Sequence, residues 1–548
     1  MLDIVIKNGM VVDGSGRPRF RADVGIRDGK IALIGDLSES EAAEVIDAAG
    51  MVVSPGFIDM HSHSDLSLMA HRRSDGSLSQ GITTEVVGSC GWSMAPVKEE
   101  TRKSVLRGLI SGLVHKEAYE SLDWTWNSFG QFLEALEKGG IGTNVAPQVG
   151  QSLVRAHVVG TEKREAAPGE IKAMKALVHQ AMEDGAFGMS TGRSYRPGGF
   201  APTQEIVELV KVVAEYDGIY ATHMKDEGDG LFDAVQEVIS IAEQTGVKAE
   251  ISHHKAIGRK NFGKVHRSLE IIEGARRRGL RITVDVYPYE FAQASALVRM
   301  LPMEAWQKLR AISRGGESKD DRHDAFPTSE EISELLKDRS LVSKVKELPE
   351  VVSASERIGN YLIVKCPSSP EIQGRILQDV ADERGTRVAD LAADLIAENG
   401  LDVWSAWPIS MDDVHTVISA GFAMGGTDAF TLDRPISPTP IHPRHYGTFP
   451  RIVGRFVNKD GLFSLEEAVR KCTYNPATVM GIPQRGLIEV GYWADLVVFD
   501  PENLMDTATG TDPYSRPEGI RYVLVNGKVS LAEGAVRPVF AGRVLRRR

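Results

Sequence analysis

The stretch GFIDMHSHSD, Gly56 to Asp65, places an apolar run directly before two histidines that stand one residue apart. Because alternating residues of a β-strand project from the same face, His61 and His63 can direct both imidazoles toward one point. In parallel α/β folds, functional groups collect at the carboxyl ends of the strands. The stretch therefore raises two questions: whether a parallel sheet surrounds it, and whether its histidines face a metal.

The chain beyond this stretch alternates strand-like and helix-like segments. The eight candidate strands are GFIDMHSH, TTEVVGSCG, TNVAPQVG, GAFGMSTG, IYATHM, KAEISHH, RITVDVYPY and FAMGGTDA. Helix-like stretches such as TQEIVELVKVVAEYDG lie between several of them and place apolar residues at three- and four-residue spacing. Repeated β–α units predict a parallel sheet, and this number of strands fits a (β/α)8 barrel, a TIM-like α/β fold. A doubly wound open sheet has the same local pattern, so both architectures remain open at this point.

The two ends of the chain differ from this middle part. LDIVIKNGMVVDG and RADVGIRDGKIALIG near the start, and GIRYVLVNGKVSLAEG near the end, have short strand patterns with Asn-Gly and Asp-Gly turn signals. We expect residues 1–55 and 482–548 to form one small β domain, and residues 56–481 to form the barrel. Two independent β appendages are the alternative.

One region of the middle part breaks the alternation. From about residue 290 to 350 the chain is charged and irregular, as in SRGGESKDDRHD. We interpret this region as an insertion over one end of the barrel that could act as a lid. A disordered surface loop is the alternative.

Composition narrows the class of protein. The chain has 548 residues, of which 42% are hydrophobic and 25% charged, and its formal net charge is −11. These values are ordinary for a soluble globular protein and argue against nucleic acid or an anionic membrane as the main partner. The sequence lacks a secretory signal pattern and any apolar run of about 18 residues. Its three cysteines are too few and odd in number for a disulfide framework, so we expect a cytoplasmic protein. The basic tail RVLRRR, Arg543 to Arg548, is predicted to be a solvated end.

Polar residues with metal-binding chemistry end several of the candidate strands. They are His61, His63, Cys90, His223, His253, His254 and Asp428. Singly, each is a weak signal, because a lone cysteine commonly packs as a small hydrophobe and a strand-end histidine commonly bonds to backbone. Together they would form one layer of imidazole, thiolate and carboxylate, and zinc accepts all three ligand types. The joint pattern therefore predicts a metal centre.

The order of these residues resembles that of the amidohydrolase superfamily, with His-x-His on the first strand, single histidines on the fifth and sixth, and aspartate on the eighth. Within it, the stretches PGFIDMHSHSD, QGITTEVVGSCGWSMAPV, GAFGMSTGRSYRPGGFA, THMKDEGD, SHHKAIG and HPRHYGTFPRIVGRFV resemble the D-aminoacylases, or N-acyl-D-amino-acid deacylases. The resemblance spans essentially the whole chain. It implies a (β/α)8 barrel with a β domain built from both chain ends. It also implies a zinc-dependent enzyme that hydrolyses the linear amide bond of an N-acyl-D-amino acid.

The resemblance implies a set of zinc ligands. Cys90, His223 and His253 match the ligands of a tight site. His61 and His63 match a second, weaker site that shares the cysteine, and whether that second site is occupied stays open.

The resemblance also implies roles in catalysis and substrate binding. Asp428 matches the catalytic acid/base, which could take a proton from a metal-bound water and deliver it to the departing nitrogen. Tyr195 is a candidate donor to the oxyanion, and the cations Lys255 and Arg444 suit the substrate carboxylate. The alternative for either cation is a solvated or salt-bridged surface residue. His254 is expected to have a structural role, because it points away from its neighbour's face.

The chain departs from the family pattern near the expected pocket. Arg193 follows Gly192 where the pattern has leucine, Lys225 replaces an arginine, and Thr427-Asp428-Ala429 replaces Ser-Asp-Gly. Arg193 could bind an acidic side chain such as that of D-glutamate or D-aspartate; a solvent-exposed Arg193 is the alternative. The departures leave room for another N-acyl amide, and a cyclic amide of the hydantoinase or dihydroorotase type is a further alternative. A non-catalytic assembly protein is less consistent with a complete ligand set, and the oligomeric state stays open.

Overall fold

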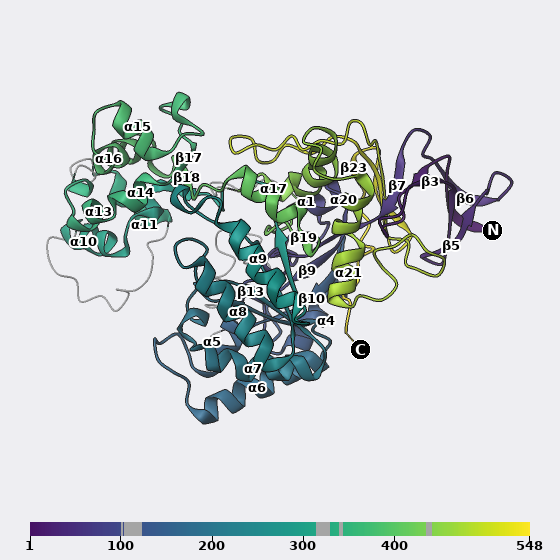
Figure 1. Cartoon of the computed structure of the whole chain (residues 1–548), viewed down its shortest axis with the longest axis horizontal. Helices are drawn as coiled ribbons and strands as arrows, with labels where there is room; N and C mark the ends of the chain where they lie inside the picture. The colour runs from purple at the N-terminus through teal and green to yellow at the C-terminus, as the bar shows by residue number, and fades with distance from the viewer. Residues whose placement is uncertain (100–101, 103–122, 314–328, 339–343, 434–440, 548) are drawn as a thin grey trace.

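The structure, a computed structural model, describes residues 1–99, 102, 123–313, 329–338, 344–433 and 441–547. Three regions lie along the longest axis of the molecule (Figure 1). A barrel occupies the middle, a β domain lies on one side of it, and a mainly helical insertion lies on the other.

The barrel contains eight strands, and they are the segments that the alternation predicts. In chain order they are β8 (Phe57–Asp59), β9 (Ile82–Val87), β10 (Asn144–Pro147), β12 (Gly188–Gly192), β13 (Ile219–His223), β14 (Lys248–Ile251), β15 (Ile282–Val286) and β19 (Ala423–Gly425). Each pairs in parallel with the next, with the short β11 (Val149–Gly150) joining β10 to β12. The ring closes between the last and first strands, where the amide of Met60 donates to the carbonyl of Gly425 and Ser62 pairs with Ala429. The (β/α)8 barrel is therefore confirmed, and an open sheet is excluded.

Helices cover the outside of the barrel. They include α1 (Asp75–Ser79), α4 (Phe129–Gly139), α5 (Gln151–Val158), α6 (Pro168–Glu183), α7 (Thr203–Glu215), α8 (Leu231–Thr245), α9 (Lys264–Arg277), α17 (Met411–Ser419), α18 (Arg444–Pro450), α19 (Phe456–Asn458), α20 (Leu465–Cys472) and α21 (Tyr474–Met480). Helix α7 shows why they dock: it buries Ile206, Leu209, Val210 and Val213 on one face. Each such side chain contributes about 1.5–3 kcal/mol on burial, which favours packing on the sheet over an isolated helix.

Both chain ends build the β domain. Its larger sheet runs β23 (Ala535–Val536), β22 (Lys528–Ala532), β21 (Ile520–Val525), β20 (Leu496–Phe499), β7 (Val52–Pro55), β2 (Met10–Val11), β3 (Phe20–Arg21). Its smaller sheet runs β5 (Lys30–Gly35), β4 (Asp23–Arg27), β1 (Leu2–Lys7), β6 (Ala42–Asp47). The ends meet where β7 and β20 pair antiparallel, with Val53 opposite Val498. One shared core, which includes Ile6 and Leu524, lies between the sheets, so a single domain replaces the alternative of two appendages.

The insertion is folded and longer than the sequence predicts. It contains strands β16 (Ser295–Ala296), β17 (Leu362–Lys365) and β18 (Trp404–Ala406), and helices α10 (Met303–Ser313), α11 (Ser329–Leu336), α13 (Pro349–Ser353), α14 (Ser355–Gly359), α15 (Leu377–Glu383) and α16 (Val388–Asn399). These elements share a core of their own, around Trp306, Leu377 and Ile396. The sequence places its end near residue 350, because the charged and irregular stretch ends there. Most of SRGGESKDDRHD lies outside the described residues.

The basic C-terminal tail is docked against the barrel, so the prediction of a solvated end is wrong. The amide of Val145 donates to the carbonyl of Arg543 at 2.9 Å, and the amide of Leu545 donates back to Val145 at 2.8 Å. The amide of Arg547 donates to the carbonyl of Gly185 at 3.0 Å. The tail thus runs along the ends of the strands opposite to the predicted ligands. Among the described helices, none combines the length and apolarity that a membrane crossing requires.

Candidate active site

The predicted metal ligands converge at the carboxyl ends of the barrel strands. His61 and His63 follow β8, Cys90 follows β9, His223 ends β13, and His253 follows β14. The Sγ atom of Cys90 lies 3.3 Å from Nε2 of His61 and 3.5 Å from Nε2 of His253. Nδ1 of His223 lies 2.9 Å from Nε2 of His253. Two parts of the chain, residues 61–90 and 223–253, are separated by more than a hundred residues and present sulfur and imidazole atoms to one point.

These residues fit a zinc ion. Tetrahedral zinc, with Zn–S of about 2.3 Å and Zn–N of about 2.0–2.1 Å, places neighbouring ligand atoms roughly 3.3–3.6 Å apart. The two sulfur–nitrogen distances, 3.3 and 3.5 Å, lie in that range, and the nitrogen–nitrogen distance of 2.9 Å is shorter. Burial alone would raise the pKa of the Cys90 thiol, but His61 and His253 beside it hold that pKa well below its usual range. This environment favours the thiolate, the form of cysteine that binds metal.

Two carboxylates orient the imidazoles of this cluster, and sequence reasoning missed both. Oδ2 of Asp285 lies 3.2 Å from Nδ1 of His61, and Oε1 of Glu227 lies 2.9 Å from Nδ1 of His253. Each imidazole consequently turns its Nε2 atom toward Cys90. Glu227 stands in the quoted motif THMKDEGD, and Asp285 lies in the candidate strand RITVDVYPY. These positions, close to the strand ends that carry the ligands, could have identified both carboxylates from the sequence.

Asp428 contacts both the cluster of ligand side chains and a buried cation, Arg444. Its Oδ1 lies 3.2 Å from Nε2 of His63 and 3.5 Å from Nε2 of His61. Its Oδ2 lies 2.7 Å from Nη1 of Arg444, a contact that is ionic rather than a well-directed hydrogen bond. Burial alone would raise the pKa of Asp428, but Arg444 and the neighbouring histidines hold it well below its usual range. Asp428 is thus a carboxylate able to accept a proton.

Left-handed backbone turns direct three of the central side chains. The φ angles are 53° at Cys90, 37° at His253 and 49° at Asp428. Such angles cost a residue other than glycine about 1–3 kcal/mol and persist where the surroundings hold them in place. The thiolate, an imidazole and the carboxylate reach one point because the chain turns sharply at the end of each strand.

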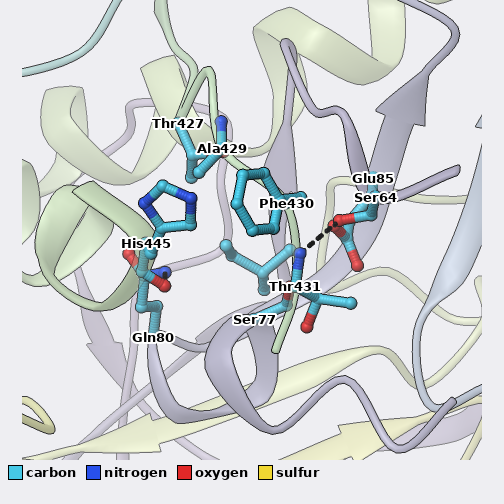
Figure 2. Close-up of a pocket in the computed structure, with 10 residues that line it drawn as sticks. Ser64, Ser77, Gln80, Glu85, Thr427, Ala429, Phe430, Thr431 and His445 are labelled. Carbon is cyan, nitrogen blue, oxygen red and sulfur yellow. Dashed lines mark hydrogen bonds between the residues drawn. The ribbon is translucent and has the colours of Figure 1, made fainter. Parts of the chain in front are cut away.

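A small cavity is lined in part by Thr427, Ala429 and Thr431, which flank Asp428 in the chain (Figure 2). Its volume is about 10 Å³, room for about one water molecule rather than a substrate. At its wall, the amide of Thr431 donates to Oγ of Ser64 at 2.9 Å, and Ser64 in turn donates to the buried carboxyl of Glu85 (Figure 2). At the start of the loop that carries Asp428, Oγ1 of Thr427 donates to Oδ2 of Asp59, the last residue of β8, at 2.5 Å. These bonds hold the loop, and with it Asp428, against the first strands of the barrel.

The predicted substrate residues border the metal cluster. The hydroxyl of Tyr195 lies 3.2 Å from Nδ1 of His223, and the Tyr195 side chain is partly exposed. Lys255 and Arg444 are buried, so the alternative of solvated surface cations is wrong for both. Their charged ends lie over the same ring, that of Tyr287, at 5.4 and 4.7 Å from its centroid. Tyr287 is a further residue of the site that sequence reasoning did not single out.

Arg193 has a partner of its own. It is 5% exposed, so the alternative of a solvent-exposed Arg193 is wrong. Nη2 donates to Oε1 of Glu237 on α8 at 2.8 Å, and Nη1 donates to the carbonyl of Ala201 at 2.8 Å. The sequence motif showed the additional cation. It did not show that Glu237, 44 residues further along the chain, pairs with it.

His254 turns away from the cluster, as predicted. Its Nε2 atom lies 2.7 Å from Oγ of Ser268 on α9. Burial lowers the pKa of His254 to about 4, so its imidazole is neutral and serves packing between the strand end and that helix.

Comparisons with known proteins show the family to which the chain belongs. The amidohydrolase family model matches residues 44–296 and 389–531. The chain is 36% identical over 546 residues to the D-aminoacylase of Alcaligenes xylosoxydans xylosoxydans, covering 100% of this chain and 98% of that protein. It is 32% identical over 548 residues to the N-acyl-D-glutamate deacylase of the same organism, covering 100% and 97%.

Solved structures agree as well. A crystal structure of D-aminoacylase superposes with a TM-score of 0.77 at 35% identity, over 100% of both chains. The N-acyl-D-glutamate deacylase of Bordetella bronchiseptica, complexed with zinc and a phosphonate inhibitor, superposes with a TM-score of 0.76 at 31% identity, over 100% of this chain and 99% of that one. This chain belongs to the D-aminoacylase family of the amidohydrolase superfamily.

Proposed function

We propose that the protein is a zinc-dependent deacylase that hydrolyses the linear amide bond of an N-acyl-D-amino acid to a carboxylate and a free D-amino acid. One observation carries the proposal: Asp428 lies within 3.2 Å of the His63 imidazole and within 2.7 Å of the Arg444 guanidinium. A general base thus stands between a metal cluster and a cation that suits the α-carboxylate of an amino acid.

The roles of the residues follow from their positions. Cys90, His223 and His253 would hold zinc at the tight site, and His61 and His63 would hold a second zinc that shares Cys90. Bound zinc supplies an acidified water and polarises the carbonyl. Asp428 would accept a proton from the attacking water and pass it to the amide nitrogen, which leaves as the amine. Tyr195 donates its hydroxyl to the oxyanion. Lys255 and Arg444 hold the substrate carboxylate, since Arg can bind it through two parallel hydrogen bonds.

The electrostatics of Arg193 bear on the amino acid side chain. The relatives include deacylases for D-glutamate and D-aspartate, at 32% identity each. Arg193 gives no support for an acidic substrate, because its guanidinium already faces the carboxylate of Glu237. We therefore propose a D-amino acid with a neutral side chain as the preferred substrate.

Amine release from a substrate panel tests the proposal. Purified protein with defined zinc is given N-acetyl-D-leucine, N-acetyl-D-glutamate, N-acetyl-D-aspartate, their L-forms and hydantoin. We expect turnover of the D-forms alone, with kcat/KM for leucine at least tenfold above that for glutamate. The matched control is Asp428→Asn, which should lower kcat by about 10²–10⁴. Turnover of hydantoin, or of no D-form while zinc is bound, would overturn the proposal, and a preference for glutamate would overturn its neutral side chain.

A further inference from the structure

One oxygen atom of Glu227 contacts both a metal ligand and a substrate cation. Glu227 lies in the loop after β13 and is buried. Its Oε1 atom lies 2.9 Å from Nδ1 of His253 and 2.7 Å from Nζ of Lys255. Lys255 is itself anchored close by, because Nζ also donates to the carbonyl of His253 at 3.0 Å.

A carboxylate is needed there because two hydrogen-bond donors meet at that point. Nε2 of His253 faces Cys90 and His223, so a metal bound among them takes the lone pair of that nitrogen. The ring proton then resides on Nδ1. Nζ of Lys255 lies 2.9 Å from the same Nδ1 and has only hydrogens to offer. Two donors therefore meet, and Oε1 of Glu227 is the acceptor within reach of both.

Asp285 provides a comparison with Glu227, because its side-chain contacts in the site are with metal-binding histidines and not with Lys255. Its Oδ2 lies 3.2 Å from Nδ1 of His61, and its Oδ1 accepts the amide of His253 at 3.0 Å. It thus orients metal ligands, whereas Glu227 contacts a ligand and Lys255 through one atom.

We propose that Glu227 is a positioning residue that couples the orientation of the ligand His253 to the placement of Lys255, so that zinc affinity and substrate binding depend on one carboxylate. The role in substrate binding rests on the proposed function, whereas the role in zinc affinity does not. Removing Glu227 would leave the Nδ1–H group beside an ammonium group, which favours rotation of the imidazole and displacement of the lysine. Carboxylates in such positions typically contribute 10–100-fold in metal affinity or activity.

Three variants of the full-length protein separate the two roles. Zinc affinity is measured by competition with a chromophoric chelator, and KM is measured with N-acetyl-D-leucine at saturating zinc. We expect Asp285→Asn to lower zinc affinity about tenfold and leave KM within about threefold of the wild-type value. Lys255→Gln should raise KM at least tenfold and leave zinc affinity within about threefold. Glu227→Gln should do both, with at least a tenfold change in each quantity.

The changes in zinc affinity and KM across the three variants test the coupling. If Glu227→Gln changes only zinc affinity or only KM, the coupling is overturned. Circular dichroism checks that each variant folds, and Glu227→Asp, which keeps the charge on a shorter arm, replaces Glu227→Gln if the latter unfolds. With Glu227→Asp the same two changes are expected at about threefold or more. If the wild-type protein hydrolyses no amide, the proposed function fails, and the chelator competition still tests whether Glu227 supports His253.

Discussion

Nη1 of Arg444 lies 2.7 Å from Oδ2 of Asp428, so the candidate general base and the candidate carboxylate-binding cation form one buried ion pair. The two residues come from different elements, the loop after β19 and the start of α18. A substrate carboxylate that binds Arg444 competes with Asp428 for the guanidinium. Substrate binding would therefore make Asp428 a stronger base at the moment when the water must be deprotonated.

Replacement of Arg444 should shift the pH dependence of catalysis. Burial raises the pKa of Asp428, and Arg444 is the largest of the influences that lower it. Activity requires the deprotonated carboxylate, so it falls as the pH drops through this pKa. Arg444→Met raises the pKa, and the acid limb of kcat/KM should move to higher pH. The pH profile of kcat/KM measures this shift.

The same variant should also raise KM at least tenfold, because a cation for the substrate carboxylate is lost. Arg455→Gln is the matched control, since Arg455 follows on the same run of helix and its side chain is 42% exposed. It should leave the profile and KM unchanged. An acid limb that stays in place in Arg444→Met would contradict the assignment of Asp428 as the base.

Loss of Cys90 should cost more zinc than loss of His61. The Sγ atom of Cys90 lies within 3.5 Å of ring nitrogens of both His61 and His253, so its removal disrupts the whole cluster. Cys90→Ala is expected to retain little zinc after dialysis, whereas His61→Ala retains more of it. Metal analysis by mass spectrometry gives the ratio. The control is Cys366→Ala, a buried cysteine of the insertion, and equal zinc in all three proteins would refute the ordering.

Arg193 should contribute to stability rather than to substrate choice. Nη2 of Arg193 and Oε1 of Glu237 are 2.8 Å apart, and their side chains are 4% and 15% exposed. Breaking one side of a mostly buried pair leaves an unmatched charge, so Glu237→Gln should lower the free energy of unfolding by about 3 kcal/mol. Urea denaturation measures that loss. The ratio of kcat/KM for N-acetyl-D-leucine and N-acetyl-D-glutamate should stay the same, and a reversal of the ratio would assign Arg193 to the substrate.

The docked tail should stabilise the barrel through Arg547. Its guanidinium donates to the carbonyls of Tyr216 and Met480 at 3.0 and 3.3 Å, and its side chain is 17% exposed. Arg547→Ala should therefore lower the melting temperature measurably in differential scanning fluorimetry. Arg546→Ala is the control, because Arg546 pairs with Glu137 at the surface and such pairs contribute only about 0–1 kcal/mol. A larger loss for Arg546→Ala would contradict this account of the tail.

The sequence alone determined the alternation of strands and helices, the eight barrel strands and the order of the metal-binding residues along them. Those features depend on local spacing, which decides the face on which each side chain lies. His61 and His63 are the clearest case, since their separation by one residue already directs both toward the same side of a strand.

Only the tertiary structure decided which charges meet. Glu227 contacts Lys255, Glu237 contacts Arg193, and the tail reaches Val145. These contacts join residues distant in the chain, and they depend on how each loop turns after its strand, as at Cys90 and His253, where φ is positive. Such turns are held by packing and hydrogen bonds from other elements, so no local pattern encodes them. The barrel could therefore be predicted from the periodicity of the sequence, whereas the charge pairs around the site could be identified only from the tertiary structure.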